Sequence, residues 1–530
     1  MLAPAKGADP LGCGILAAPS PPPANAAFLD DLVDALVADA EGFSNLAHRC
    51  TCQVQASDRT TVVRLGSLQL VLELSHPTSR RGGLSQQLLI NRHLSIVPRQ
   101  QGPRGRPTNG SPFSSYMIGI LENDECFTKV MPARRPLHIA VALDGAGWHP
   151  AAWREAAARP AELFSARYWT DLAQRAERGL LDFVTIEDGF ALQSSRYDGP
   201  DGRTDQVRGR LDAVLVAARI APTTSHVGLL PSVTATHTEP FHISKAIATL
   251  DFVSSGRAGV RVQVSGRASE AGLFGRRPFA GIPWADREGP EGRTRAAELF
   301  EELSDYVEVL RRLWDSWEDD AEIRDAATGR FVDREKLHYI DFQGRLFSVK
   351  GPSITPRPPQ GQPLVTALAH SSLPYRFAAR HADVVFVTPE NGEDAAAILA
   401  EVRSEEAEAG RPEEEVRVFA DLLVFLDDVE RAARDRLGRL DELAGYESRS
   451  DAHVFLGTPR QLAALLAEWH GAGLAGFRLR PGTIPHDLDA IADGLIPALQ
   501  ARGLFRTSHD ATTLRGRLGL PRPANRYSAA

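Results

Sequence analysis

Hydrophobic and polar residues alternate strictly along one segment of the chain, from Ala258 to Ser265. Successive side chains of a β-strand point to opposite faces, so residues 258–264 are predicted to form a strand. One face carries valines, and the other carries Arg261, Gln263 and Ser265. A helix-period segment and a Ser-Ser-Gly turn at 254–256 precede it. The fold must therefore provide apolar contacts for the valine face of this strand and polar partners for the other face.

Seven further segments have the composition of buried strands, and helix-period segments lie between them. The other predicted strands are 137–143, 181–186, 226–232, 363–369, 383–388, 416–426 and 476–481. The predicted helices include 168–180, 211–221, 243–253, 306–317, 375–382 and 488–503. Eight alternating units predict an α/β fold of the (β/α)8 TIM-barrel type. Two long insertions interrupt the pattern, at 266–296 after the fourth strand and at 318–362 after the fourth helix.

A barrel gives the polar face of the fourth strand a location. Alternate residues of a barrel strand point outward to the helices or inward to the axis, so the valines suit the helix layer. Arg261 and Gln263 would then lie inside the barrel or at its mouth. Burying an unpaired arginine is costly. Two interpretations remain open: a carboxylate from another strand pairs with Arg261, or a polar ligand binds at the carboxyl ends of the strands.

The ends of the second and third strands carry candidate functional groups, at the face where barrel enzymes keep their active sites. Glu187 and Asp188 follow the second strand and could act as a general base, bind a hydroxyl or amide group, or cap the next segment. Hydroxyl residues and a histidine follow the third strand, among them Ser232 and His237. His237 and His242 have no third ligand nearby in the sequence, so we predict no metal site.

The end of the fifth strand has the features of an anion site. His370, Ser371 and Ser372 directly precede or begin a predicted helix whose first turn contains Pro374. Free backbone N–H groups, small hydroxyls and the positive end of a helix dipole favour a bound anion. The alternative is a helix N-cap without a ligand.

The first 130 residues differ from the rest of the chain. All four cysteines lie there, and proline, glycine and serine interrupt short apolar runs. We expect residues 1–130 to be a poorly structured extension, or to lie upstream of a true start at Met131, and residues 131–530 to form the barrel domain. The pair Cys50 and Cys52 lacks a second pair at metal spacing, which argues against a zinc site.

Composition and missing motifs narrow the class of function. The net charge of -8 argues against a nucleic-acid-binding protein. No run of 18 apolar residues and no signal peptide are present, so we expect a cytoplasmic protein. The P-loop, nucleophile-elbow, zincin and dinucleotide-binding motifs are absent from the sequence. These features favour an enzyme that acts on a small molecule.

Residues 136 to about 526 resemble the luciferase-like flavin-dependent monooxygenases, in the branch of the nitrilotriacetate, dibenzothiophene-sulfone and long-chain-alkane monooxygenases. The segments that carry the resemblance include "AERGLLDFVTIED", "EPFHISKAIATLDFVSSGRAG", "YVEVLRRLWDSWEDDA" and "GLFRTSHDATTLRGRLGLPRP". The resemblance implies a barrel that binds reduced FMN, delivered by a separate flavin reductase. Dioxygen then reacts with the flavin, and one oxygen atom passes to a small organic substrate. We also expect a homo-oligomer.

The resemblance implies cofactor contacts for Asp188, Ser232 and Ser371, with His370 beside the last of these. Arg261 stands where the family has Asn, and we expect it to supply a positive charge near the flavin. Phe300 falls in the segment that matches another flavin contact. The predicted cofactor residues are Asp188, Ser232, Arg261, Gln263, Phe300, His370, Ser371 and Ser372, and the predicted polar groups near the reacting centre are His237 and Glu187.

Two other functions are compatible with the same residues. A deazaflavin in place of FMN would make the chain a hydride-transfer oxidoreductase on the same fold. A barrel that binds flavin or a metabolite without turnover is the second alternative. The insertions at 266–296 and 318–362 are expected to determine which substrate is bound.

Overall fold

The computed structural model describes residues 137–283, 285, 287–411, 416–509 and 511–528 with their side chains, and four earlier strands by their backbone. The chain divides into two units, Met1–Asn123 and Asp124–Ala530. In the first unit, β1 (Cys52–Ser57), β2 (Thr60–Leu65), β3 (Leu68–Glu73) and β4 (Ser95–Ile96) form an antiparallel sheet in that order. The sequence pattern predicted no strand there. The proposed start at Met131 lies outside the described residues.

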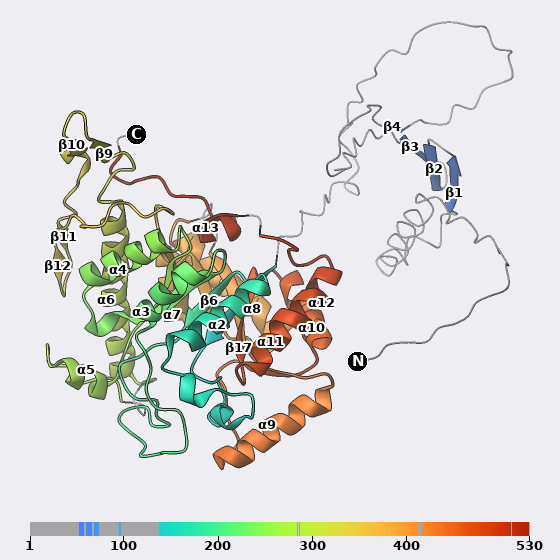
Figure 1. The fold of residues 1–530 in the computed structure, drawn as a ribbon, viewed down its shortest axis with the longest axis horizontal. Helices are drawn as coiled ribbons and strands as arrows, with labels where there is room; N and C mark the ends of the chain where they lie inside the picture. Colours follow the sequence, from blue (N-terminus) through green and yellow to red (C-terminus); the bar gives the residue numbers. More distant parts are fainter. Residues whose placement is uncertain are drawn as a thin grey trace, which may run out of the picture. The chain divides into compact units, whose positions relative to one another are not determined.

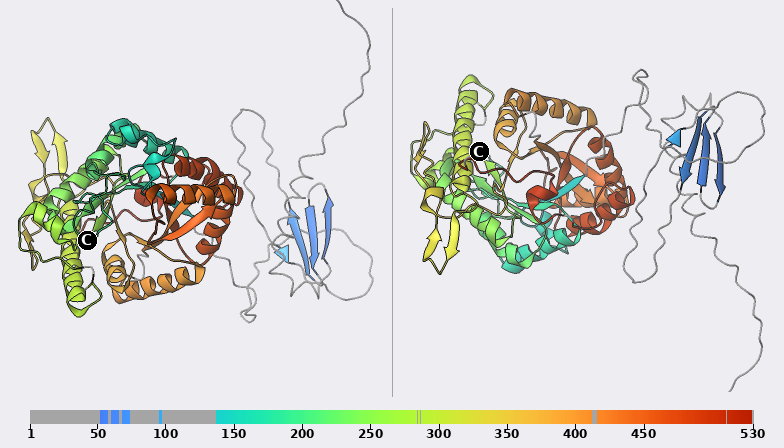
Figure 2. Two further views of the ribbon diagram at one scale, coloured as in Figure 1. Left: turned by 90° about the horizontal axis from the view of Figure 1, so that it is seen from below. Right: turned by 90° about the horizontal axis from the view of Figure 1, so that it is seen from above.

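The second unit contains a closed barrel of eight parallel strands, as predicted (Figure 2). Its strands are β5 (His138–Leu143), β6 (Phe183–Ile186), β7 (Gly228–Thr234), β8 (Gly259–Gln263), β13 (Leu364–Leu368), β14 (Val384–Val387), β15 (Arg417–Leu426) and β17 (Gly476–Pro481). Pairing of β14 with β15 and of β17 with β5 closes the ring. A further strand, β16 (His453–Gly457), pairs with the second half of β15 and was not predicted.

Helices surround the barrel (Figures 1 and 2). They are α2 (Ala166–Arg178), α3 (Ala213–Ile220), α4 (Pro240–Val253), α6 (Pro290–Asp315), α7 (Ser372–His381), α8 (Gly392–Glu408), α9 (Glu430–Ala444), α10 (Pro459–Gly471), α11 (His486–Ala490) and α12 (Ile496–Ala501). Local sequence explains several of their starts, since Asp212 caps α3 and Thr458 caps α10. Helix α6 begins 16 residues before the predicted start of 306, because Pro290 occupies a favourable first helical position.

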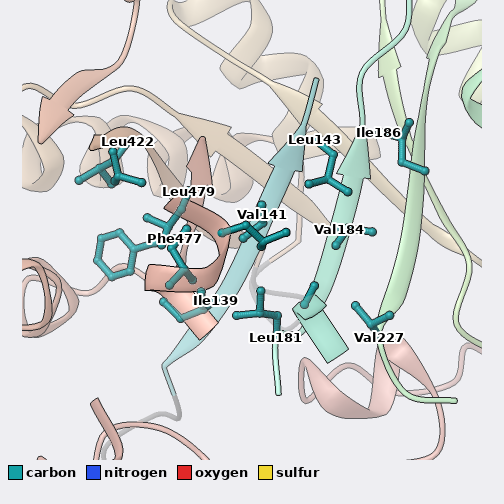
Figure 3. Packing of buried hydrophobic residues seen from close by; sticks show 14 of the residues in the cluster. Ile139, Val141, Leu143, Leu181, Val184, Ile186, Val227, Leu422, Phe477 and Leu479 are labelled. Carbon is teal, nitrogen blue, oxygen red and sulfur yellow. The ribbon is translucent and has the colours of Figure 1, made fainter. Parts of the chain in front are cut away.

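The outward faces of the strands form the main core between barrel and helices. Figure 3 shows Ile139, Val141 and Leu143 of β5 beside Val184 of β6 and Leu479 of β17. These residues alternate with inward-pointing ones, as the strand period requires. The same holds for β8, whose Val260 and Val262 pack in an apolar cluster with side chains of α4 and α6.

The inner floor of the barrel is apolar. Phe183, Phe386 and Phe419 pack there with ring centres 5.7–6.2 Å apart. Leu514 of the short helix α13 (Leu514–Arg517) joins this cluster. A Cβ added at Gly228 would lie 2.7 Å from a Leu514 methyl carbon, so the glycine leaves space for this plug. The polar inner residues of the barrel therefore lie nearer the carboxyl ends of the strands.

The turn between α4 and β8 explains the segment "LDFVSSGRAG". The Asp251 carboxylate accepts hydrogen bonds from the backbone N–H groups of Ala258 (3.1 Å) and Gln360 (3.0 Å). The Arg257 guanidinium donates to the carbonyl oxygens of residues 221, 224 and 227. Gly256 has a φ of 84°, which a glycine adopts without strain. Both charged residues therefore hold the turn.

The two insertions have different structures. The first contains the helix α5 (Ala268–Phe274) and leads into α6. The second contains two hairpins, formed by β9 (Glu322–Asp325) with β10 (Arg330–Val332) and by β11 (Phe342–Gln343) with β12 (Ser348–Val349).

Of the helices that the structure describes, none is long and apolar enough to cross a membrane.

Candidate active site

A cavity of about 570 Å³ opens at the carboxyl ends of β5 to β8. Residues that follow or end these strands line it, namely Asp144, Glu187, Asp188, Thr234 and Gln263. Its size lies within the range of small-molecule sites, and this end of a barrel is where active sites form. The cavity is therefore the candidate active site.

The first insertion and α6 form the opposite wall of the cavity. Ile282 and Glu270 come from the insertion, and Leu299 and Phe300 come from α6. No residue of the second insertion, 318–362, lines the cavity. Of the two insertions, the first therefore lines the candidate site; that the insertions determine which substrate is bound stays a prediction.

Arg261 does not point freely into the cavity, because it belongs to a buried network below it. Its side chain is 5% exposed, its Nε donates to the Ser232 hydroxyl at 2.9 Å, and its Nη2 donates to the Glu187 carboxylate. Arg478 Nη1 donates to the other oxygen of Glu187 at 3.3 Å. The interpretation in which a carboxylate from another strand pairs with Arg261 is confirmed.

The network continues through two arginines of β17 that sequence reasoning missed. Arg478 Nε donates to Asp421 Oδ1 at 2.8 Å, and Arg480 Nε donates to Asp421 Oδ2 at 2.9 Å. Arg480 also pairs with Asp451 at 2.5 Å. The neighbour of Arg478 on β5 is the small Ala140, which leaves space for the guanidinium. The alternation in "GFRLRP" is the same signal as in β8 and could have identified these residues.

Charges within this network nearly balance, because three arginines meet three carboxylates. Burial alone would raise the pKa of Glu187, but the charges of Arg261 and Arg478 outweigh burial and lower it below its ordinary value. The pKa of Asp421 is lowered in the same way by Arg478 and Arg480. Glu187 is thus ionised at neutral pH and held by two guanidiniums, which favours an electrostatic role over proton transfer.

Asp188 and Gln263 lie together at the cavity wall. Asp188 accepts hydrogen bonds from the backbone N–H groups of Gly189 (2.7 Å) and Ala213 (2.9 Å). The second bond shows that Asp188 does cap the next segment, as one interpretation predicted. Burial raises the pKa of Asp188, and these two bonds only partly offset it. The Gln263 amide donates to the Thr234 hydroxyl at 2.8 Å and to the Asp188 carbonyl oxygen at 3.1 Å.

Two ion pairs occupy the cavity wall. Arg210 Nε donates to Asp144 Oδ1 at 3.1 Å, and a second guanidinium nitrogen bonds the other oxygen. Arg267 Nη1 lies 3.3 Å from Glu270 Oε1, and its guanidinium lies over the Tyr197 ring, 5.5 Å from the ring centre. Asp144 and Arg210 come from loops 66 residues apart, which no local pattern connects, and Arg267 and Glu270 lie at the start of helix α5, which was not predicted.

His237 is buried among aromatic rings and does not line the cavity. The ring centres of Phe274 and Phe279 lie 5.3 and 5.5 Å from its own. Its Nε2 is buried without a hydrogen-bond partner. Burial, helped by the charge of Arg277, lowers the pKa of His237, so the ring is neutral at pH 7.

The predicted anion site lies at the N-terminus of α7 and contributes no residue to the cavity lining. Ser371 is the N-cap residue, and its hydroxyl makes no capping hydrogen bond. Ser372 donates to Glu401 at 2.5 Å. His370 Nδ1 lies 2.9 Å from the Thr388 hydroxyl, and its Nε2 lies 3.6 Å from Asp451. Ser371 therefore occupies the N-cap position of the ligand-free interpretation without making a capping bond, and the anion site stays a prediction.

The predicted site residues thus fall into four groups. Glu187, Asp188, Gln263 and Phe300 meet at the cavity. Ser232 and Arg261 lie in the buried layer below it, and His237 lies among the aromatic rings. The segment 370–372 forms the fourth group.

A model of the luciferase-like monooxygenase family matches residues 146–476, more than half of the chain. The chain is 29% identical to N-acetyl-S-(2-succino)cysteine monooxygenase of Bacillus subtilis, over 74% of this chain and 99% of that protein. It is 28% identical to nitrilotriacetate monooxygenase component A of Aminobacter aminovorans, over the same shares of the two chains. The solved structure of a long-chain alkane monooxygenase superposes with a TM-score of 0.64 and 24% identity, covering 72% of this chain and 95% of that one. By this match, the chain belongs to the luciferase-like monooxygenase family.

Proposed function

We propose that this member of the luciferase-like monooxygenases binds reduced FMN in the cavity at the ends of β5 to β8 and uses dioxygen to oxygenate a small organic molecule. The observation that carries the proposal is the combination of the family match with a cavity of about 570 Å³ at this end of the barrel. Its walls combine flat apolar side chains with a few hydrogen-bonding groups, as cofactor sites do.

The donors and acceptors around the cavity fit a flavin. The amide of Gln263 and the carboxylate of Asp188 are suited to the hydrogen-bonding edge of the ring system. Trp148 and Phe300 offer apolar surfaces to its faces. The cavity has no unpaired guanidinium for a phosphate among its described residues. We therefore assign the FMN phosphate to the N-terminus of α7, where the Ser371 hydroxyl makes no capping bond.

Reduced flavin, when bound, would supply the electrons that activate dioxygen; one oxygen atom of dioxygen passes to the substrate and the other is reduced to water. The chain contributes a site that holds charge in fixed positions. Glu187 stays ionised between Arg261 and Arg478, so the floor of the cavity keeps a constant charge through the reaction. The neutral His237 ring packs among aromatic side chains and does not line the cavity, so we assign it no contact with the substrate.

A separate flavin reductase is the proposed partner. The relative from Aminobacter aminovorans is named as component A, which indicates a multi-component system. The described part of this chain contains the barrel and no separate domain that would bind a nicotinamide cofactor. We propose, on the same basis, a cytoplasmic homo-oligomer that receives reduced FMN by diffusion.

Oxygen consumption tests the proposal. Anaerobically reduced FMN is mixed with the full chain and then with oxygenated buffer, and flavin absorbance is followed in stopped flow. We expect the chain to change the rate or the course of FMN oxidation relative to free flavin. Turnover with a reduced deazaflavin and no oxygen uptake would replace FMN chemistry by hydride transfer. Flavin binding without any effect on oxidation would support the non-catalytic alternative.

The phosphate assignment has its own test. Ser371→Ala should weaken FMN binding about tenfold, the loss of one hydrogen bond to a charged group, and leave riboflavin binding unchanged. Ser225→Ala, an exposed serine at the other end of the barrel, is the matched control. Equal loss of FMN and riboflavin affinity in Ser371→Ala would contradict the assignment.

A further inference from the structure

The charged side chains around the cavity restrict the substrates that it can hold. Among the described residues that line it, four carry carboxylates and two carry guanidiniums. The carboxylates are Asp144, Glu187, Asp188 and Glu270, and the guanidiniums are Arg210 and Arg267. A substrate with several negative charges would therefore meet more carboxylates than cations.

Both guanidiniums at the cavity wall are already paired with carboxylates of the chain. Arg210 makes two hydrogen bonds to Asp144, the geometry that satisfies a guanidinium best. Arg267 is paired with Glu270 and stacked on Tyr197. A substrate carboxylate would have to share either arginine with a carboxylate that already balances its charge.

The buried layer below the cavity supplies no free positive charge either. Arg261 and Arg478 both bond Glu187, and Arg478 and Arg480 both bond Asp421. Asp451 pairs with Arg480, so three carboxylates match three arginines. The Asp188 carboxylate accepts its hydrogen bonds from the backbone N–H groups of Gly189 and Ala213.

Apolar side chains share the remainder of the cavity wall with polar ones. Trp148, Leu192, Val264, Ile282 and Phe300 are among its residues. The largest of these come from three different loops and from α6, so the apolar surface extends around the cavity. Such a wall favours ligands that bury apolar area.

Resting on the proposed oxygenation site, we infer that its substrate is an uncharged organic molecule, and not a polycarboxylate. Two relatives at 28–29% identity are named for compounds that carry several carboxylates, nitrilotriacetate and N-acetyl-S-(2-succino)cysteine. The long-chain alkane monooxygenase is named for an uncharged one. Because carboxylates outnumber guanidiniums among the residues that line this cavity, we expect an uncharged substrate for this chain as well.

A charge-releasing variant tests the inference. Asp144→Asn keeps an acceptor oxygen for Arg210 but removes the negative charge, so Arg210 becomes available to an anion. Glu270→Gln does the same for Arg267. Asp205→Asn is the matched control, because it releases Arg203, which does not line the cavity. The probes are propane-1,2,3-tricarboxylate and its trimethyl ester, which has the same skeleton without the charges.

Calorimetric titration of the FMN-saturated full chain gives the readout. We expect no saturable binding of the tricarboxylate to wild type, and binding at least about tenfold tighter in Asp144→Asn and Glu270→Gln. Neither Asp205→Asn with the tricarboxylate nor Asp144→Asn with the ester should show this gain. The gain should also fall as salt is added.

Three results would overturn the inference. The first is that wild type binds the tricarboxylate as tightly as Asp144→Asn does. The second is that neither Asp144→Asn nor Glu270→Gln gains affinity for the tricarboxylate. The third is that wild type binds the cation tetramethylammonium through Asp188. FMN saturation is measured first, by quenching of flavin fluorescence. If FMN does not bind, the proposed function fails, and the same titrations on the flavin-free chain still test the charge balance.

Discussion

Glu187 is the residue whose loss should disturb the barrel interior most clearly. Its carboxylate accepts hydrogen bonds from Arg261 and Arg478, and the side chains of these three residues are at most 10% exposed. Glu187→Gln keeps the shape and one acceptor oxygen but leaves Arg261 with only the Ser232 hydroxyl and a neutral amide. Removing one partner of a buried ion pair costs about 3–5 kcal/mol. Because Gln still accepts a hydrogen bond, we expect about 3 kcal/mol.

The partner substitution should cost less. Arg261→Met leaves Glu187 with Arg478 at 3.3 Å, so the carboxylate remains paired, and we expect a loss of about 2 kcal/mol. In the double variant neither a buried arginine nor a buried carboxylate lacks its partner, since Arg478 still bonds Asp421. The double variant should therefore be more stable than Glu187→Gln alone, which requires a coupling of at least about 2 kcal/mol.

Urea denaturation, followed by tryptophan fluorescence and circular dichroism, measures these differences at constant m-value. Asp205→Asn is the exposed control and should be indistinguishable from wild type, because Arg203 and Asp205 meet at the surface. A Glu187→Gln variant within about 1 kcal/mol of wild type would refute the account of the network. Strict additivity of the two single substitutions would refute it as well.

The pH dependence follows from the direction of the pKa shift. The pKa of Glu187 is lowered in the folded chain, so its ionisation stabilises the fold above its unfolded value of about 4.3. That stabilisation is lost as the pH falls through the folded pKa. The gap between wild type and Glu187→Gln should therefore narrow when the pH is lowered below about 4. A constant gap across this range would contradict the assignment.

Three further predictions concern other parts of the barrel. The pKa of Asp182 is lowered to about 2, because the charges of His138 and Arg506 outweigh the effect of burial. Asp182→Asn should therefore lower the free energy of unfolding, measured by urea denaturation at pH 7, by about 3 kcal/mol. This loss should shrink as the pH falls from about 4 towards 2. Gly256→Ala should lower the melting temperature by an amount equivalent to about 1–3 kcal/mol. The reason is that residue 256 has a φ of 84° and the new Cβ would lie 2.9 Å from the Thr513 side chain. An unchanged melting temperature would mean that the turn adjusts to the alanine without strain. His237→Phe keeps the ring packing and removes a buried nitrogen that has no hydrogen-bond partner. The free energy of unfolding, measured by thermal denaturation, should therefore change by no more than about 0.5 kcal/mol. A loss above about 2 kcal/mol would reveal a hydrogen bond to that ring.

Much of the fold could be read from periodicity. The eight barrel strands were predicted to within two residues at each end, because each is a short apolar run between turn residues. The β16 strand was missed because its residues also fit the approach to a helix cap at Thr458. The start of α6 was missed because residues 290–305 are rich in charged side chains that carry a weak helical period.

The candidate site was only partly predictable. Residues directly after a strand, such as Glu187 and Asp188, lie at the cavity because strand ends meet there in any barrel. The role of Arg261 was open, since the partner that decides it, Glu187, lies 74 residues away in the sequence. The prediction that Arg261 supplies a charge to the flavin remains a prediction, but its guanidinium is already bonded to two side chains.

The sequence by itself determined the barrel, the inward direction of the polar face of β8 and the membership of the family, because all three depend on local pattern and on residues in fixed order. Only the tertiary structure decided which charges meet. Asp144 pairs with Arg210 across 66 residues, and Asp421 pairs with Arg478 across 57. Pairing of this kind depends on strand register and loop closure in three dimensions, and no local rule specifies it. It also determines the charge of the cavity, and so the class of molecule that the cavity can hold.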